Sequence, residues 1–157
     1  VGTGKSFLAA CIANGLLDQG VSVMMTNFTR ILNKLSDLQV KERSQFISDF
    51  GKVDLLIIDD LGVERNSEFA LEQVYSVVDE RYKANLPLII TTNLTPKQMR
   101  SVQDVAHARI YSRVLEMCTP ILLQGADRRK SISSGKRVLA KQILFPQKEV
   151  QPNGKTE

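Results

Sequence analysis

The sequence contains no tryptophan, two cysteines and one histidine among its 157 residues. Cys11 and Cys118 are too few and too far apart for a disulfide framework or a Cys-x-x-Cys site, so we interpret both as reduced core residues of a cytoplasmic protein. Because His107 is the only histidine, a cysteine–histidine catalytic pair is not expected. No apolar run approaches the roughly 20 residues that span a bilayer, and no membrane segment is predicted.

Hydrophobic residues make up 43% of the chain and charged residues 24%, which is typical of one soluble globular domain. The net charge of +4 is unevenly placed. From Arg128 onward, eight lysines and arginines face only Glu149 and Glu157, so the remainder of the chain is slightly acidic. Such a basic tail fits either contact with a polyanion or simple solvation.

The first six residues read Val-Gly-Thr-Gly-Lys-Ser and match the end of the phosphate-binding P-loop, G-x-x-x-x-G-K-[ST]. In such a loop Gly2, Thr3 and Gly4 bring backbone N–H groups close to a polyphosphate. Lys5 would contact the β- and γ-phosphates of ATP, and Ser6 would bind Mg²⁺. The loop's first glycine and the strand that feeds it are expected upstream of Val1. Taken alone, the string also fits an ordinary glycine turn.

Alternating apolar patterns predict an α/β fold, an open parallel sheet with helices on both faces. Expected strands cover residues 21–26, 53–58, 87–93 and 119–125. Expected helices follow the P-loop as far as Gly20, run from a Thr29 cap toward Gly51, cover residues 71–82, begin at the capping box Thr95-Pro-Lys-Gln98, and cover residues 105–117.

Acidic and amide side chains end two of these strands. Asp59 and Asp60 follow a rigid apolar strand, where Asp59 would bind the Mg²⁺ shell and Asp60 would orient or deprotonate the attacking water. Asn93 ends the next strand and would reach the γ-phosphate. An acidic cap and a plain turn asparagine are the alternatives. A GTPase is excluded because no N-K-x-D follows Asp59 at the required spacing.

These motifs resemble the AAA+ ATPases, and within them the DnaC-type helicase loaders and the IstB-like transposition ATPases. The resemblance rests on residues 1–6, 55–62, 89–93, 109–113 and 125–129. It implies a RecA-like P-loop NTPase core over residues 1–130 that lacks its first strand here and has no C-terminal helical lid. Residues 131–157 would form a basic, mostly unstructured tail.

The resemblance also suggests roles for individual residues. Asn93 is similar to sensor 1, and Arg113 to the arginine finger that reaches a neighbouring subunit's ATP, with Arg109 beside it. Arg129 is similar to the sensor 2 arginine, although Arg128 is an alternative to it.

The function implied is an Mg²⁺-dependent ATPase, a homo-oligomer with ATP between its subunits, that loads a replicative DNA helicase onto single-stranded DNA. The alternatives are an IstB-like regulator of a transposase, a nucleotide-gated interaction module and a small-molecule kinase. A kinase would normally add an arginine-bearing lid. Candidate DNA phosphate contacts are the basic tail and Arg30, Lys34 and Lys41.

Overall fold

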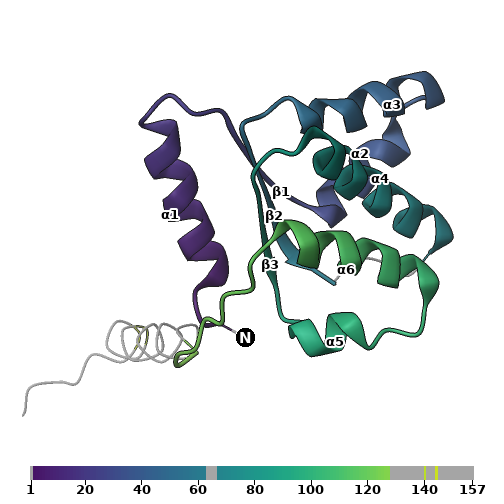
Figure 1. Cartoon of the computed structure of the whole chain (residues 1–157). Helices are drawn as coiled ribbons and strands as arrows, with labels where there is room; N and C mark the ends of the chain where they lie inside the picture. The colour runs from purple at the N-terminus through teal and green to yellow at the C-terminus, as the bar shows by residue number, and fades with distance from the viewer. Residues whose placement is uncertain (1, 63–66, 128–139, 141–143, 145–157) are drawn as a thin grey trace, which may run out of the picture. The chain divides into compact units, whose positions relative to one another are not determined.

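Three parallel strands organise the described part of the chain, which comprises residues 2–62, 67–127, 140 and 144 of a computed structural model (Figure 1). The strands are β1 (Val23–Asn27), β2 (Leu55–Leu61) and β3 (Leu88–Thr92), in the order β1-β2-β3. The helices are α1 (Lys5–Leu17), α2 (Phe28–Asp37), α3 (Val40–Ser48), the 3₁₀ turn η1 (Asp49–Gly51), α4 (Glu68–Ala84), α5 (Pro96–Arg100) and α6 (Val105–Met117). These elements belong to the unit Gly4–Leu123; residues 1–3 and 124–157 form a second unit.

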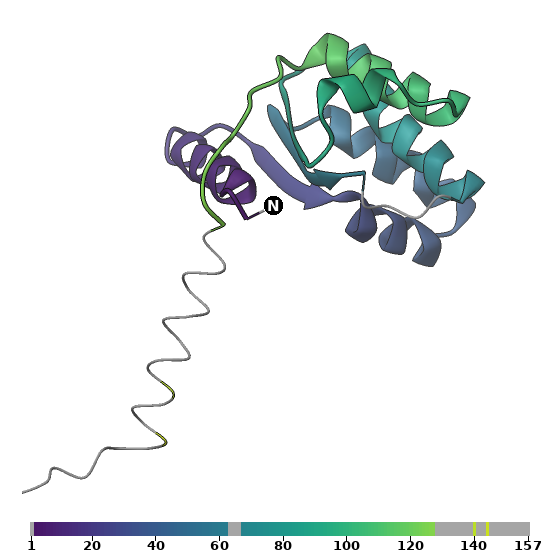
Figure 2. The same cartoon turned by 90° about the horizontal axis from the view of Figure 1, so that it is seen from below.

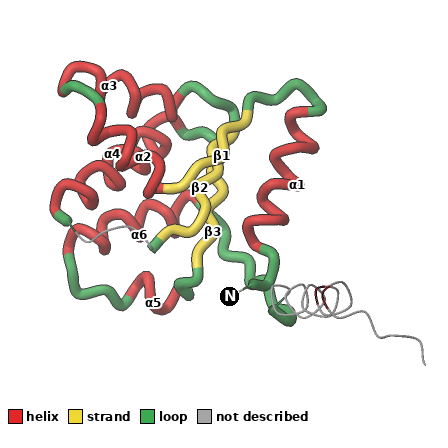
Figure 3. The backbone as a smooth tube through the Cα atoms, turned by 180° about the vertical axis from the view of Figure 1, so that it is seen from behind, coloured by secondary structure: helices red, strands yellow, loops and turns green. Residues whose placement is uncertain are grey.

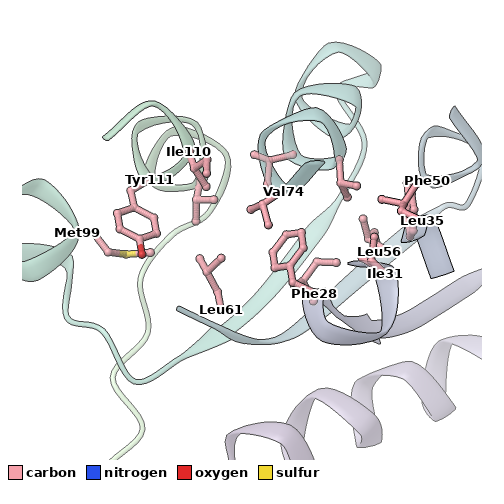
Figure 4. Packing of buried hydrophobic residues seen from close by; sticks show 14 residues of the cluster. Phe28, Ile31, Leu35, Phe50, Leu56, Leu61, Val74, Met99, Ile110 and Tyr111 are labelled. Carbon is pink, nitrogen blue, oxygen red and sulfur yellow. The ribbon is translucent and has the colours of Figure 1, made fainter. Parts of the chain in front are cut away.

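Helices cover both faces of the sheet, as the sequence predicted. Figures 1 and 2 show α1 on one face and α2, α4 and α6 on the other, and Figure 3 shows the strands between them. On the larger side, side chains from β2, α2, α4 and α6 form one apolar core, in which Leu61, Phe28, Val74 and Ile110 converge (Figure 4). β2 is the best buried strand, because Leu55–Ile58 are all at most 5% exposed.

The other face of the sheet, opposite α2, α4 and α6, is covered by α1, mainly through small side chains. Ala9 and Ala13 pack on Leu55 and Ile57. Leu16 is partly buried against the same cluster. The other large apolar side chains of α1 and its cysteine are exposed, namely Phe7, Leu8, Cys11, Ile12 and Leu17. The prediction that Cys11 is a core residue is therefore wrong, because α1 packs on the sheet through Ala9, Ala13 and Leu16 and leaves Cys11 exposed.

The helix expected from Thr29 to Gly51 is two helices and a 3₁₀ turn. Leu38 adopts an extended conformation after α2. The next helix, α3, begins at Val40 and is capped by Gln39, whose N–H donates to the Glu42 carboxylate over 3.0 Å. The cap of α2 is Asn27 rather than Thr29, since the Asn27 Oδ1 accepts from the Arg30 N–H at 2.9 Å.

The start of α5 agrees with the sequence. Thr95 and Gln98 form the predicted capping box of α5, with Pro96 in its first turn.

The prediction of a strand at residues 119–125 is wrong, because these residues have no strand conformation and Ile121 and Leu122 are 83% and 77% exposed. A strand needs a hydrogen-bonding neighbour, and the neighbour expected for this one was the P-loop strand upstream of Val1. No described helix is long and apolar enough to cross a membrane.

Candidate nucleotide-binding site

The carboxyl ends of β2 and β3 lie beside the first turn of α1, because parallel strands end at the same edge of a sheet. Lys5, the first residue of α1, donates from Nζ to Asn93 Oδ1 over 2.8 Å. Asn93 follows β3 directly. Two of the predicted site residues, 88 positions apart in the chain, are therefore in contact.

The start of α1 has the features of an anion site. Gly4 has a φ of 94°, which favours glycine, and it caps the helix without a side-chain hydrogen bond. No acidic residue lies in the first turn. The first N–H groups of a helix and its dipole attract negative charge, so this terminus suits a phosphate, with Ser6 one residue after Lys5.

The two glycines of the loop differ in their surroundings. An added Cβ at Gly4 meets nothing within 4 Å, so the need for glycine there comes from its positive φ alone. Gly2, in the second unit, has a φ of 76° and the carboxylate of Asp127 lies against it. The Thr3 hydroxyl is buried and, among the described atoms, has no hydrogen-bond partner.

Asp59 and Asp60 lie side by side near the end of β2 but differ in exposure. Asp59 is half-buried and pairs in register with Asn27 of β1, whereas Asp60 is exposed. The pairing of β2 with β3 is irregular between Ile58 and Leu61, and Asp60 has a φ of 57°. A regular strand would direct these two side chains to opposite faces of the sheet, and the alternation is interrupted where the register shifts and Asp60 takes a positive φ.

The sequence did not identify the residue that contacts both aspartates, which is Thr91 of β3. Its hydroxyl donates to Asp59 Oδ1 at 2.5 Å and accepts from the Asp60 N–H at 3.0 Å. Thr91 is only 6% exposed. The polar pair Thr91-Thr92 at the end of an apolar strand was a signal in the sequence, because a buried hydroxyl requires a partner.

Arg113 is held by α4. Its Nε donates to Asp79 Oδ1 over 3.0 Å, and its guanidinium lies over the rings of Tyr75 and Tyr82. Arg109 also stacks on Tyr75 but is exposed. These contacts orient two arginines on one helix and restrain Arg113 more than Arg109.

Asp79 is the acceptor that joins this cluster. A hydrogen bond from Lys83 is the largest cause that lowers the pKa of Asp79, and the charges of Lys83 and Arg113 add to it. An ionised Asp79 neutralises the charge of Arg113 in the isolated chain.

Arg128 and Arg129, the sensor 2 candidates, lie outside the described residues, as does most of the expected tail.

A parallel sheet with helices on both faces, and a glycine loop entering a helix at the strands' carboxyl edge, defines a P-loop domain. A crystal structure of DnaI superposes with a TM-score of 0.66 at 30% identity, covering 82% of this chain and 68% of that chain. The fold is that of the AAA+ P-loop domains of such replication proteins.

The model of the IstB-like ATP binding protein family matches residues 1–135, and the chain belongs to that family. Among curated relatives, the replicative helicase loader DnaC of Escherichia coli (strain K12) is 34% identical over 101 residues, which are 62% of this chain and 41% of DnaC. The replicative helicase loader DnaI of Bacillus subtilis (strain 168) is 29% identical over 142 residues, 82% of this chain and 45% of DnaI. The chain thus spans less than half of these two relatives.

Proposed function

We propose that this protein is an ATP-binding and ATP-hydrolysing accessory protein of DNA replication, which loads a replicative helicase onto single-stranded DNA in the cytoplasm. The observation that carries the proposal is the hydrogen bond between Lys5 and Asn93. It places the P-loop lysine at the edge of the sheet where the Asp59-Asp60 pair also lies. The helicase-loader names of the relatives support the choice of process.

In the proposed site, Gly2 to Ser6 hold the phosphates of ATP, and Lys5 exchanges its contact with Asn93 for the β- and γ-phosphates. The hydroxyl of Ser6 and the carboxylate of Asp59 are hard oxygen donors of the kind Mg²⁺ uses together with phosphate oxygens. Once bound, Mg²⁺ would neutralise charge on the phosphates. Asp60, exposed and close to Asp59, is the group that accepts a proton from water.

Asn93 and Arg113 would complete the site. Released by Lys5, the Asn93 amide orients the water or the γ-phosphate. Arg113 acts in a neighbouring subunit, because an arginine always carries its charge and stabilises phosphoryl charge across an interface. Arg129 would contact ATP from its own subunit.

The test uses the full-length protein with a fluorescent ATP analogue and a phosphate-release assay. We expect Lys5→Ala to abolish analogue binding, and Asn93→Ala to retain binding but lower hydrolysis about 100-fold. Lys52→Ala is the matched control, since Lys52 forms only an exposed ion pair with Asp49 and should change neither. Binding that survives Lys5→Ala would overturn the nucleotide site.

The trans role of Arg113 has its own test. Hydrolysis per subunit should rise with protein concentration, and Arg113→Ala should remove that rise while analogue binding persists. Activity independent of concentration and unchanged in Arg113→Ala would contradict the shared site.

A second candidate is regulation of a transposase, which the match to the IstB-like family model favours. Two separate pull-downs distinguish the two roles, one with a hexameric replicative helicase and one with a transposase that works with an IstB-like ATP-binding protein. ATP-dependent capture of the helicase alone supports the loader, and capture of the transposase alone supports the alternative.

A further inference from the structure

Thr91 is the side chain through which β3 contacts both aspartates of β2. Its Oγ1 lies 2.5 Å from Asp59 Oδ1 and 3.0 Å from the Asp60 backbone nitrogen. The residue is 6% exposed, so water cannot readily replace either contact.

The chemistry of the groups fixes the direction of both hydrogen bonds. A backbone N–H can only donate, so the Thr91 oxygen accepts from Asp60. The single hydroxyl proton is then free to point at Asp59 Oδ1, which accepts it. Thr91 therefore occupies one oxygen of the Asp59 carboxylate and leaves Oδ2 for other ligands.

The contact with Asp60 falls where the backbone is least regular. Asp60 has a φ of 57°, a conformation that costs a residue other than glycine about 1 kcal/mol or more. The register also shifts here, between Ile58 and Leu61, so the regular ladder is interrupted. The hydroxyl of Thr91 thus accepts a hydrogen bond from the Asp60 N–H at a position where the backbone hydrogen bonds between β2 and β3 are irregular.

The neighbouring residue Thr92 provides a comparison. Its hydroxyl donates to the Leu61 carbonyl at 2.7 Å and accepts from the Leu94 N–H at 3.1 Å. Thr92 thus ties the same two strands together without touching either aspartate. The hydroxyl at position 91 therefore contacts the candidate site, whereas the hydroxyl at position 92 contacts the end of β2 and the loop after β3.

We propose that Thr91 is a positioning residue for ATP hydrolysis, which sets the orientation of the Asp59 carboxylate and the backbone of Asp60. This inference rests on the proposed function. Because Asn93, which accepts from Lys5, directly follows this strand, a shift of β3 on nucleotide binding would move the contacts of Lys5, Asp59 and Asp60 together. Thr91 thereby links the strand that precedes Asn93 to the two aspartates, of which Asp59 would hold Mg²⁺ and Asp60 would act on water.

The test compares Thr91→Val, Thr91→Ser and Thr92→Val in the full-length protein. Valine keeps the shape and removes the hydroxyl, whereas serine keeps the hydroxyl. We expect Thr91→Val to lower kcat roughly 10- to 100-fold, as loss of a group supporting a metal ligand does, with the KM for ATP within about threefold. It should also raise the Mg²⁺ concentration needed for half-maximal rate. Thr91→Ser and Thr92→Val should stay within about threefold of the wild type.

A second measurement does not depend on activity. Amide hydrogen exchange should be at least about tenfold faster at Asp60 in Thr91→Val but not in Thr92→Val, because only the first loses the acceptor of that N–H. Unchanged kcat and unchanged exchange in Thr91→Val would overturn the proposal, as would an equal loss of kcat in Thr92→Val. If the wild type neither binds nor hydrolyses ATP, the proposed function fails and with it the catalytic part of this inference. The exchange rate still decides the geometric part.

Discussion

Arg81 is a cation with no exposed surface, held entirely by backbone carbonyls. Its guanidinium donates to the carbonyl oxygens of Phe50, Val53, Asp54 and Pro87 at 2.6–3.1 Å. These carbonyls belong to the segments that lead into β2 and β3, at the opposite edge of the sheet from Lys5. Arg81 therefore fixes where the two strands that carry the candidate site begin.

We expect Arg81→Met to lower the free energy of unfolding by about 3 kcal/mol or more, because the methionine leaves several buried carbonyls without a donor. Arg81→Lys should recover only part of this loss, since three donors on one nitrogen cannot reproduce the planar fork. Urea unfolding followed by circular dichroism measures both. The control is Arg100→Met, an exposed site where a change within about 0.5 kcal/mol is expected. Equal losses at the two positions would contradict this role for Arg81.

At the residue scale, the sequence indicated the residues of the candidate site better than the residues that hold the framework together. Lys5, Asp59 and Asn93 belong to motifs whose chemistry is evident from residue type and order. Arg81 does not, although it lies three residues after Val78 on the buried stripe of α4, and Thr91 was hidden within a strand pattern. Their roles depend on which backbone atoms lie opposite them, which only the fold determines.

At the scale of elements, the loop before β1 is fastened to the loop before β2 by one carboxylate. Asp54 Oδ2 accepts from the Ser22 hydroxyl at 2.6 Å and from the Ser22 N–H at 2.9 Å. These two hydrogen bonds, the side-chain one first, lower the pKa of Asp54 below its ordinary value of 3.8. The ionised form is thus favoured in the folded state.

The sign of the resulting pH dependence follows from linkage. Because the folded pKa is depressed, the stabilisation is fully present above the unfolded pKa of 3.8 and is lost as the pH falls through the folded value. We expect the difference in urea midpoint between the wild type and Asp54→Asn to be constant from about pH 7 to 5 and to shrink below about pH 4. Ser22→Ala should show a similar dependence, and the double variant should be less than additive. A difference that grows on acidification would contradict the assignment.

The pairing of α4 with α6 leads to a prediction about Arg113. In the free chain Arg113 donates to Asp79, at a site where the two side chains are 26% and 14% exposed. Under the proposed function, we expect Arg113 to leave this carboxylate when it reaches a neighbour's ATP. A half-buried pair of this kind is worth up to about 1 kcal/mol, or about fivefold in an equilibrium.

Accordingly, Asp79→Asn should raise hydrolysis up to about fivefold at protein concentrations below saturation. The change should disappear in an Arg113→Ala background. Lys83→Gln is the control: it removes the other partner of Asp79, which lies at 2.7 Å, without releasing Arg113, and no rise is expected. A fall in activity in Asp79→Asn would show that Asp79 orients the arginine and does not restrain it.

The elements that the sequence misplaced share a physical cause. Periodicity identified β2, α4 and α6 well, because these elements bury one face or both. It could not show the break at Leu38, since the apolar spacing continues across it into α3. The strand predicted at residues 119–125 was based on apolar composition alone. A strand also needs a neighbouring strand with which to form hydrogen bonds.

At the scale of the whole molecule, unpaired positive charge on α2 is the described feature that suits nucleic acid. Arg30 and Lys34 are exposed, lie one turn apart on α2 and form no ion pair among the described residues. Lys41 lies on α3, so the three candidate phosphate contacts predicted from these helices are divided between α2 and α3. Arg30 and Lys34 are therefore the better candidates for adjacent phosphates of a single strand.

We expect the double variant Arg30→Gln/Lys34→Gln to weaken binding of the full-length protein to single-stranded DNA and to flatten its salt dependence. Each lost phosphate contact on a single strand reduces the slope of log K against log salt by about 0.7, so the pair should reduce it by about 1.4. Fluorescence anisotropy between roughly 50 and 200 mM salt measures the slope. Lys52→Gln/Lys97→Gln removes the same charge from the residue after η1 and from α5, and its slope should stay that of the wild type. If both double variants lower the affinity and the slope equally, the effect is one of net charge and is not specific to α2. An unchanged slope in Arg30→Gln/Lys34→Gln would show that α2 makes no phosphate contact.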